Sequence, residues 1–261
     1  MKQNNLLWLV IVLLLLIVAV LVVWLVYIMV ISPPVATPET PVPTATSPAA
    51  TAPPSQPTAG PTPTPISGDP AELLGKPDGQ DSFDNDNHWA LFNNQCFQSE
   101  IKEGMFWMRA KGMKGFSCWE VSWPQIANYY VETILEMPQE CDQDDRFGLF
   151  FRAPDNNRGY LYGLSCGGLY SMTSWDGSST NVIVDFASSE HILVSPGERN
   201  RIGVIADGSN YSLYVNGYFL TQVSDSMFVD EGKIGYFVRA ATEDSFTVRY
   251  DDLKVWDLSK E

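Results

Sequence analysis

Short runs of β-branched and aromatic residues, separated by turn residues, fill the chain from residue 69 onward. Val, Ile, Tyr, Phe and Trp form the runs, and Gly, Asn, Asp and Pro interrupt them every eight to fourteen residues. This spacing is typical of antiparallel strands joined by short turns. Apart from one expected helical turn at 70–74, no segment here has a convincing long period of 3.6 residues. We therefore expect an all-β fold.

The runs are numerous enough to predict an architecture. About 12–14 strands in residues 68–261 fit one two-sheet antiparallel sandwich better than a barrel or two domains. Asn216-Gly217, between LYV and YFL, predicts a two-residue hairpin because both turn positions favour positive φ. The clearest expected strands are 105–111, 129–137, 147–153, 160–165, 200–206, 211–215, 233–239 and 247–255.

Alternation assigns the two faces of these strands. A strand sends successive side chains to opposite sides of its sheet. The strand at 147–153 therefore has a bulky face suited to the core and a mixed face, where glycine leaves room for a concave surface. The core face would hold Phe147, Leu149 and Phe151, and the mixed face Gly148, Phe150 and Arg152.

Residues 6–31 form a run of 26 positions without a charged side chain. As a helix the run would be about 39 Å long, enough to cross a hydrocarbon core of about 30 Å with some tilt. A cleaved signal peptide is the alternative, but its apolar core would be only about 7–15 residues long. We expect an uncleaved transmembrane helix. Lys2 precedes it and no Lys or Arg follows until Lys76, which predicts a cytoplasmic tail at 1–5 and an extracellular C-terminal domain.

Residues 32–67 contain 12 of the 18 prolines and a single charged residue, Glu39. Such a segment has too little apolar surface to offset the entropy of folding, and its prolines favour an extended conformation. We expect a Pro/Thr/Ala/Ser-rich linker that separates the membrane from the domain at 68–261. An O-glycosylated stalk, or a ligand for proline-reading domains, is the alternative interpretation.

The overall charge excludes some partners. The formal net charge is −15, from 16 basic and 31 acidic residues, and the isoelectric point is near 4.4. This balance argues against a protein that binds nucleic acid by neutralising phosphates, and against a polybasic membrane-surface binder.

Four cysteines lie in the expected outer domain. Cys96 and Cys118 flank one predicted hairpin, and Cys141 and Cys166 flank the next pair of strands. An even count in an oxidising compartment indicates disulfides, in one of three connectivities. Sequential pairing would stabilise the fold by about 3 kcal/mol per bridge in the chain-entropy model. The spacings contain no C-x-x-C, which makes zinc the weaker interpretation.

Signatures of catalysis are weak. Neither His88 nor His191 belongs to an H-E-x-x-H motif, and no G-x-S-x-G is present. Glycoside hydrolysis would need two carboxylates about 5–10 Å apart, and we assign Glu132 and Glu136 to one strand face at that scale. Solvated acids on an outward face are the simpler interpretation.

Two acidic clusters suggest the hypothesis of a structural calcium site. Asp84 and Asp86, with Asp81 nearby, lie at the start of the domain, and Asp251 and Asp252 lie at its end. Because first and last strands of a sandwich often pair, the clusters could meet and supply the oxygen ligands that Ca²⁺ prefers. An acidic loop and a turn at a strand end are the alternative.

A sugar platform would need an exposed aromatic ring. Most tryptophans of the outer domain should be in the core, but Trp119 and Trp175 are the better surface candidates because of their places beside Cys118 and before a turn. An exposed indole beside Arg152 could stack on a sugar ring while polar groups contact its hydroxyls. The candidate ligand-binding residues are Trp119, Phe150, Arg152 and Trp175.

Several segments carry a resemblance to a known family: 89–91, YYVETILEM (129–137), 145–177, 199–217 and VRYDDLKVW (248–256). Together they resemble bacterial, membrane-anchored laminin G-like domains of the concanavalin A-like jelly-roll type, and are similar to the domain of the 3-keto-disaccharide hydrolase family. The resemblance covers nearly all of 80–257. It implies two curved antiparallel sheets, frequent carbohydrate or protein-surface binding, and in some members a structural calcium.

The resemblance specifies fold better than activity. Glycosidases of this fold carry E-x-D-x-x-E on a central strand, and the nearest stretch here, 132–136, lacks the middle Asp and the spacing. The expected function is therefore a membrane-anchored, surface-displayed, non-catalytic binding module for glycan or cell-envelope material. A glycoside hydrolase, and a structural or protein-adhesion module, are the alternatives.

Overall fold

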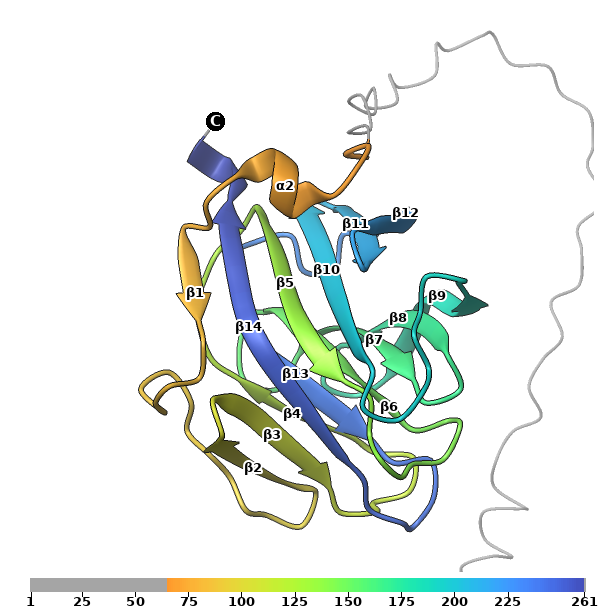
Figure 1. Ribbon diagram of the computed structural model, residues 1–261. Coiled ribbons are helices and arrows are strands. Elements are labelled where there is room, and N and C mark those ends of the chain that lie inside the picture. Colours follow the sequence, from red (N-terminus) through yellow and green to blue (C-terminus); the bar gives the residue numbers. More distant parts are fainter. Residues whose placement is uncertain (1–64, 261) are drawn as a thin grey trace, which may run out of the picture. The chain divides into compact units, whose positions relative to one another are not determined.

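The structure, a computed structural model, describes residues 65–260, which form a two-sheet antiparallel β-sandwich (Figure 1). One sheet has eight strands and the other six. Helix within this range is limited to α2, Pro70–Leu74, and one 3-10 turn, Leu258–Lys260. The predicted all-β class and the helical turn at 70–74 are thus confirmed.

The eight-stranded sheet has the order β12-β11-β10-β5-β14-β3-β2, and β1 also pairs with β14. Its strands are β1 Gly79–Asp81, β2 Phe97–Lys102, β3 Met105–Ala110, β5 Tyr129–Glu136, β10 Arg199–Asp207, β11 Asn210–Val215, β12 Tyr218–Ser224 and β14 Thr247–Asp257.

The six-stranded sheet has the order β4-β13-β6-β7-β8-β9. Its strands are β4 Ser117–Val121, β6 Arg146–Ala153, β7 Gly159–Ser165, β8 Leu169–Trp175, β9 Thr180–Ser188 and β13 Lys233–Arg239. In both sheets every strand named from the sequence is present, and its ends differ little from the predicted bounds.

The hairpin signal at Asn216-Gly217 is also confirmed. These two residues form the whole connection between β11 and β12, and their φ angles are 51° and 81°. Such angles match the right-handed twist of the flanking strands, and Asn and Gly adopt them most easily.

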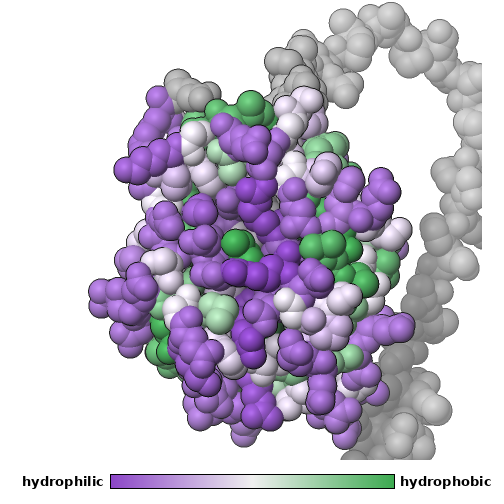
Figure 2. Space-filling view, in the orientation of Figure 1, coloured by the Kyte–Doolittle hydropathy of each residue, from purple (hydrophilic) through white to green (hydrophobic). Residues whose placement is uncertain are grey.

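The core lies between the two sheets and is filled by alternate residues of their strands. Phe147, Leu149 and Phe151 of β6 all belong to it, as predicted from alternation. The outward residue Phe150 belongs instead to a separate apolar cluster on the other side of its sheet. The six-stranded sheet therefore has an apolar cluster on its outer face as well, whereas the other sheet presents a mostly hydrophilic outer face (Figure 2).

Tyrosine hydroxyls join the two sheets through the core. Tyr250 of β14 donates to the carbonyl of Phe237 in β13 at 3.0 Å, and the Tyr236 hydroxyl lies 2.9 Å from Thr133 Oγ1 of β5. The Tyr236 and Tyr250 rings also stack, with centroids 3.9 Å apart. Burial raises the pKa of both phenols, so they remain neutral donors at physiological pH.

Both disulfides follow the sequential connectivity. Cys96 is bonded to Cys118, and Cys141 to Cys166. The first bridge ties the residue before β2, an edge strand of the eight-stranded sheet, to β4 of the six-stranded sheet. The second closes the segment that holds β6 and β7. Each bridge therefore limits the separation of elements that are distant in the unfolded chain.

The predicted membrane span and most of the linker lie outside the described residues. Within 65–260 no helix is long and apolar enough to cross a membrane. Ile66, which the sequence assigns to the linker, packs against an apolar cluster on the outer face of the eight-stranded sheet, and its carbonyl accepts from Tyr214 Oη at 3.3 Å.

Loss of a disulfide should destabilise the domain by a predictable amount. The Cys141→Ser/Cys166→Ser double variant opens a loop with a sequence separation of 25, so its free energy of unfolding should fall by about 3 kcal/mol. Urea unfolding followed by tryptophan fluorescence measures this change. A loss below about 1 kcal/mol would mean that the bridge does not restrict the unfolded chain as the entropy model requires.

Candidate functional site

A pocket of about 400 Å³ opens on the outer face of the six-stranded sheet. Residues of β4, β13, β6, β7 and β8 line it because these strands send every second side chain away from the core. Register places the aromatic and aliphatic residues of neighbouring strands beside one another: Phe237 pairs with Trp119 and Leu161 with Phe150. The apolar lining consists of Phe116, Trp119, Leu161, Trp175 and Phe237.

Aromatic rings supply most of the apolar lining of the pocket. The Trp119 indole stacks on Phe150, with centroids 5.0 Å apart and planes 13° apart, and Trp175 lies 6.4 Å from Trp119. Phe150 is completely buried, whereas both indoles are half-buried. Trp119 Nε1 donates to the carbonyl of Asn156 at 3.0 Å, which fixes the direction of the ring. The indoles therefore present surface to a ligand, and Phe150 supports Trp119 from below.

Glycine provides the space for this arrangement. A Cβ at Gly163 would lie 2.1 Å from the carbonyl oxygen of Phe147 and 2.9 Å from the Phe237 ring. Gly148, its partner on β6, would place a Cβ 2.3 Å from the carbonyl oxygen of Tyr162. Gly148 and Gly163 thus leave the middle of the outer face without side chains, and the large rings on either side cover this space.

Polar groups surround the aromatic surface. Hydroxyls come from β4, β8 and β9, and two guanidinium groups come from Arg146 and Arg239. The hydroxyl residues are Ser117, Ser171, Thr173 and Thr180. None of the residues that line the pocket is an acid or a histidine, so this arrangement can stack and hydrogen-bond a ligand but offers no general acid or base.

The structure corrects the placement of Arg152. The ladder between β6 and β13 shifts register between Lys233 and Gly235, and Arg152 itself has a φ of 51°. This bulge interrupts the alternation that would place Arg152 on the same face as Phe150. The prediction that Arg152 shares the mixed face with Phe150 is wrong, because its buried guanidinium lies over the core rings of Tyr129 and Tyr211.

The buried guanidinium of Arg152 donates hydrogen bonds to backbone carbonyls. It donates to the carbonyls of Val229, Asp230 and Gly208, the last two at 2.9 and 3.2 Å. It also lies 3.4 Å from Asn128 Oδ1. Arg152 therefore holds three connecting segments together, and its hydrogen bonds point away from the aromatic pocket.

The four candidate calcium ligands are Asp84, Asp86, Asp251 and Asp252. The first and last strands do pair, as β1 and β14, but this pairing does not bring the carboxylates into one group. Asp251 is ion-paired with Arg199, and Asp252 with Lys254 at 3.4 Å. Across residues 65–260, no three His, Cys, Asp or Glu side chains could hold one metal ion. The structural calcium therefore stays a prediction.

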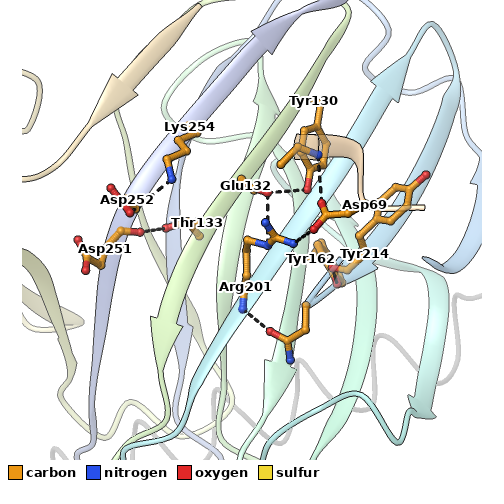
Figure 3. A network of polar contacts seen from close by, with 12 residues as sticks. Asp69, Tyr130, Glu132, Thr133, Tyr162, Arg201, Tyr214, Asp251, Asp252 and Lys254 are labelled. Carbon is orange, nitrogen blue, oxygen red and sulfur yellow. Dashed lines mark hydrogen bonds and ion pairs between the residues drawn. The ribbon is translucent and has the colours of Figure 1, made fainter. Parts of the chain in front are cut away.

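A second polar arrangement lies on the outer face of the eight-stranded sheet (Figure 3). Arg201 bridges Asp69, which caps α2, and Glu132, whose Oε2 is 3.5 Å from Arg201 Nε. Tyr130 Oη donates to the same carboxylate oxygen at 2.8 Å. Glu132 is buried, and burial raises its pKa against the opposing effect of Arg201. The interpretation of Glu132 as a solvated acid is therefore wrong.

Glu132 and Glu136 do not form a catalytic pair. Both are on one strand, but positions i and i+4 of an extended strand are about 13 Å apart, which exceeds the separation assumed from the sequence. Glu136 is also ion-paired with Arg249 at 2.7 Å. Each carboxylate thus has its own cation.

Comparisons with known proteins identify the fold. No family model matches the sequence, and a search of curated proteins finds no match. The structure is similar to a carbohydrate-binding module, CBM66, from Bacillus subtilis, with a TM-score of 0.52 and 16% identity over 66% of this chain and 98% of that one.

Two glucanases are similar to this structure to about the same degree. The Bacillus licheniformis β-glucanase has a TM-score of 0.51 and 10% identity, over 70% of this chain and 99% of that one. A β-1,3-1,4-glucanase from a mouse hindgut metagenome has a TM-score of 0.50 and 12% identity, over 69% and 98%. The fold that the resemblance implies, a two-sheet jelly-roll sandwich, is confirmed. The similarity to one particular hydrolase family stays a prediction.

Replacement of Arg152 should act on stability. In Arg152→Ala the carbonyls that now accept from the guanidinium would be buried without a donor, so the free energy of unfolding should fall by about 3 kcal/mol or more. Chemical unfolding measures this loss. A stable Arg152→Ala protein with impaired ligand binding would instead support the original placement beside the indoles.

The buried carboxylate of Glu132 should give a defined pH dependence. Since its pKa is raised on folding, the folded state holds the proton more tightly, and wild-type stability should fall relative to Glu132→Gln as pH rises from about 4 through the raised pKa. Urea unfolding across this pH window tests the difference. Tyr130→Phe removes a hydrogen bond to the carboxylate and should move the window upward. Parallel profiles for wild type and Glu132→Gln would contradict the assignment.

Proposed function

We propose that this chain is a membrane-anchored, surface-displayed glycan-binding module whose ligand occupies the pocket on the six-stranded sheet. The observation that supports it most directly is the pair of half-buried indoles, Trp119 and Trp175, whose ring centroids are 6.4 Å apart in the lining of the pocket. The C–H faces of a sugar ring pack on such surfaces, and nearby hydroxyls can contact the sugar's own hydroxyls.

The chemistry of the pocket favours binding over hydrolysis. Its lining includes no carboxylate or imidazole, and the two acids proposed from sequence lie on the other sheet, each paired with its own arginine. Hydrolysis by a carboxylate pair needs two such groups beside one bound sugar. A protein-adhesion role would use the same surface, and it predicts no measurable affinity for glycans.

Surface display is the part of the proposal that rests on sequence. The uncharged run at 6–31 would anchor the chain, and the proline-rich segment at 32–67 would hold the domain away from the bilayer. The two disulfides support an oxidising compartment for the domain.

A glycan panel tests the binding function. The full chain in detergent should bind at least one soluble glycan, and Trp175→Ala should weaken that binding at least about tenfold because a central stacking surface is lost. Trp119→Ala should act in the same direction. Trp107→Ala removes an indole from β3 of the other sheet and serves as the matched control. Equal losses for all three variants, or glycan turnover, would contradict the proposal.

A further inference from the structure

Two arginines face each other at one end of the pocket. Arg239 of β13 and Arg146 of β6 are directly opposed in the sheet register, and both line the pocket. Ser117 pairs with Arg239 on its other side, and Ser165 pairs with Arg146. The two cations therefore lie in the middle of a polar row, next to the row that contains Trp119 and Phe237.

Neither guanidinium has an anionic partner among the residues that the structure describes. Four of the remaining arginines in residues 65–260 form ion pairs, namely Arg158, Arg199, Arg201 and Arg249. Arg152 donates to carbonyls, and Arg109 to Ser245. Arg146 has only a ring contact, with its guanidinium 4.9 Å from the centroid of Phe186. In this part of the chain, no ion pair or side-chain hydrogen bond involves Arg146 or Arg239.

Such a pair is unfavourable in the free protein. Like charges directly opposite each other in a sheet destabilise it. Burial also lowers the pKa of Arg239, with no neighbouring acid to oppose the effect. The chain carries 31 acidic residues against 16 basic ones, so acids are abundant, yet none lines this pocket. An anion between the two guanidinium groups would remove the repulsion and supply the missing partner.

We propose that the ligand is an acidic glycan, with a carboxylate or sulfate bound between Arg146 and Arg239 while a sugar ring packs on the indoles. This inference rests on the proposed glycan-binding function and specifies the charge of its ligand. Arginine suits the role because its planar fork binds a carboxylate or sulfate through two parallel hydrogen bonds. The net charge of −15 repels polyanions in general, so binding of one would need a local site such as this.

Matched pairs of glycans test the charge requirement on the full chain. The pairs are polygalacturonate and its methyl ester, sialyllactose and lactose, and dextran sulfate and dextran. The first two pairs test for recognition of a carboxylate, and the third pair tests for recognition of a sulfate. We expect at least one acidic member to bind at least about tenfold more tightly than its neutral partner, with an affinity that falls as salt rises.

Variants assign the effect to the arginines. Arg146→Gln and Arg239→Gln should each reduce acidic-glycan affinity at least about tenfold, whereas Arg109→Gln, an exposed arginine without an ion pair on the other sheet, should not. Each pocket variant should also keep or raise the melting temperature, because it removes like-charge repulsion. A lower melting temperature in both would indicate a structural role and overturn the inference.

The remaining outcomes separate the inference from the function on which it rests. A neutral glycan could bind as tightly as its acidic partner, with the binding lost in Trp175→Ala but kept in Arg146→Gln. This result would overturn the inference that the ligand is acidic and leave the glycan-binding function intact. Acidic binding that survives Trp175→Ala would place the anion elsewhere and overturn the inference. Failure of every glycan, acidic or neutral, would contradict both.

Discussion

Alternation of side chains across a β-strand is the constraint on which the rest of this structure depends. In the six-stranded sheet one set of alternating residues fills the core, and the other set places a cluster of aromatic and aliphatic residues on the outer face beside polar ones. Within β6, Leu149 points inward and the neighbouring Phe150 points outward. Antiparallel sheets at a protein surface commonly have a polar outer face, as the eight-stranded sheet does (Figure 2). The aromatic outer face is thus the feature that requires a functional explanation.

The two sheets divide the charged residues differently. On the eight-stranded sheet, cations and anions neutralise one another. Arg201 joins Asp69 and Glu132 (Figure 3), and Arg249 joins Glu136. On the six-stranded sheet, Arg146 and Arg239 are opposed without an acid. The first arrangement stabilises the fold and attaches α2 to the sheet. The second leaves two donors unoccupied next to an aromatic surface, which is the arrangement expected of a binding site.

Sequence reasoning succeeded where the signal was local. Turn residues and β-branched runs located the strands, and Asn216-Gly217 located a hairpin with both φ angles positive. It failed where long-range register decides: Arg152 follows Phe150 by two positions, but a bulge against β13 turns it into the interior. Likewise, Arg146 and Arg239 are far apart in the chain and become neighbours only through the pairing of β6 and β13. Alternation with Phe150 and Phe237 could have placed each on the outer face, but not opposite the other.

The amino-acid sequence by itself determined the β class, the strand positions and the core-facing residues of β6. These properties depend on turn chemistry and two-residue periodicity, which act over a few neighbouring positions. Only the tertiary structure decided which strands pair, where a bulge reverses a side chain, and which charges are left without partners. Those outcomes depend on contacts between segments far apart in the chain, because hydrogen-bond register and burial are set by the assembled sheets.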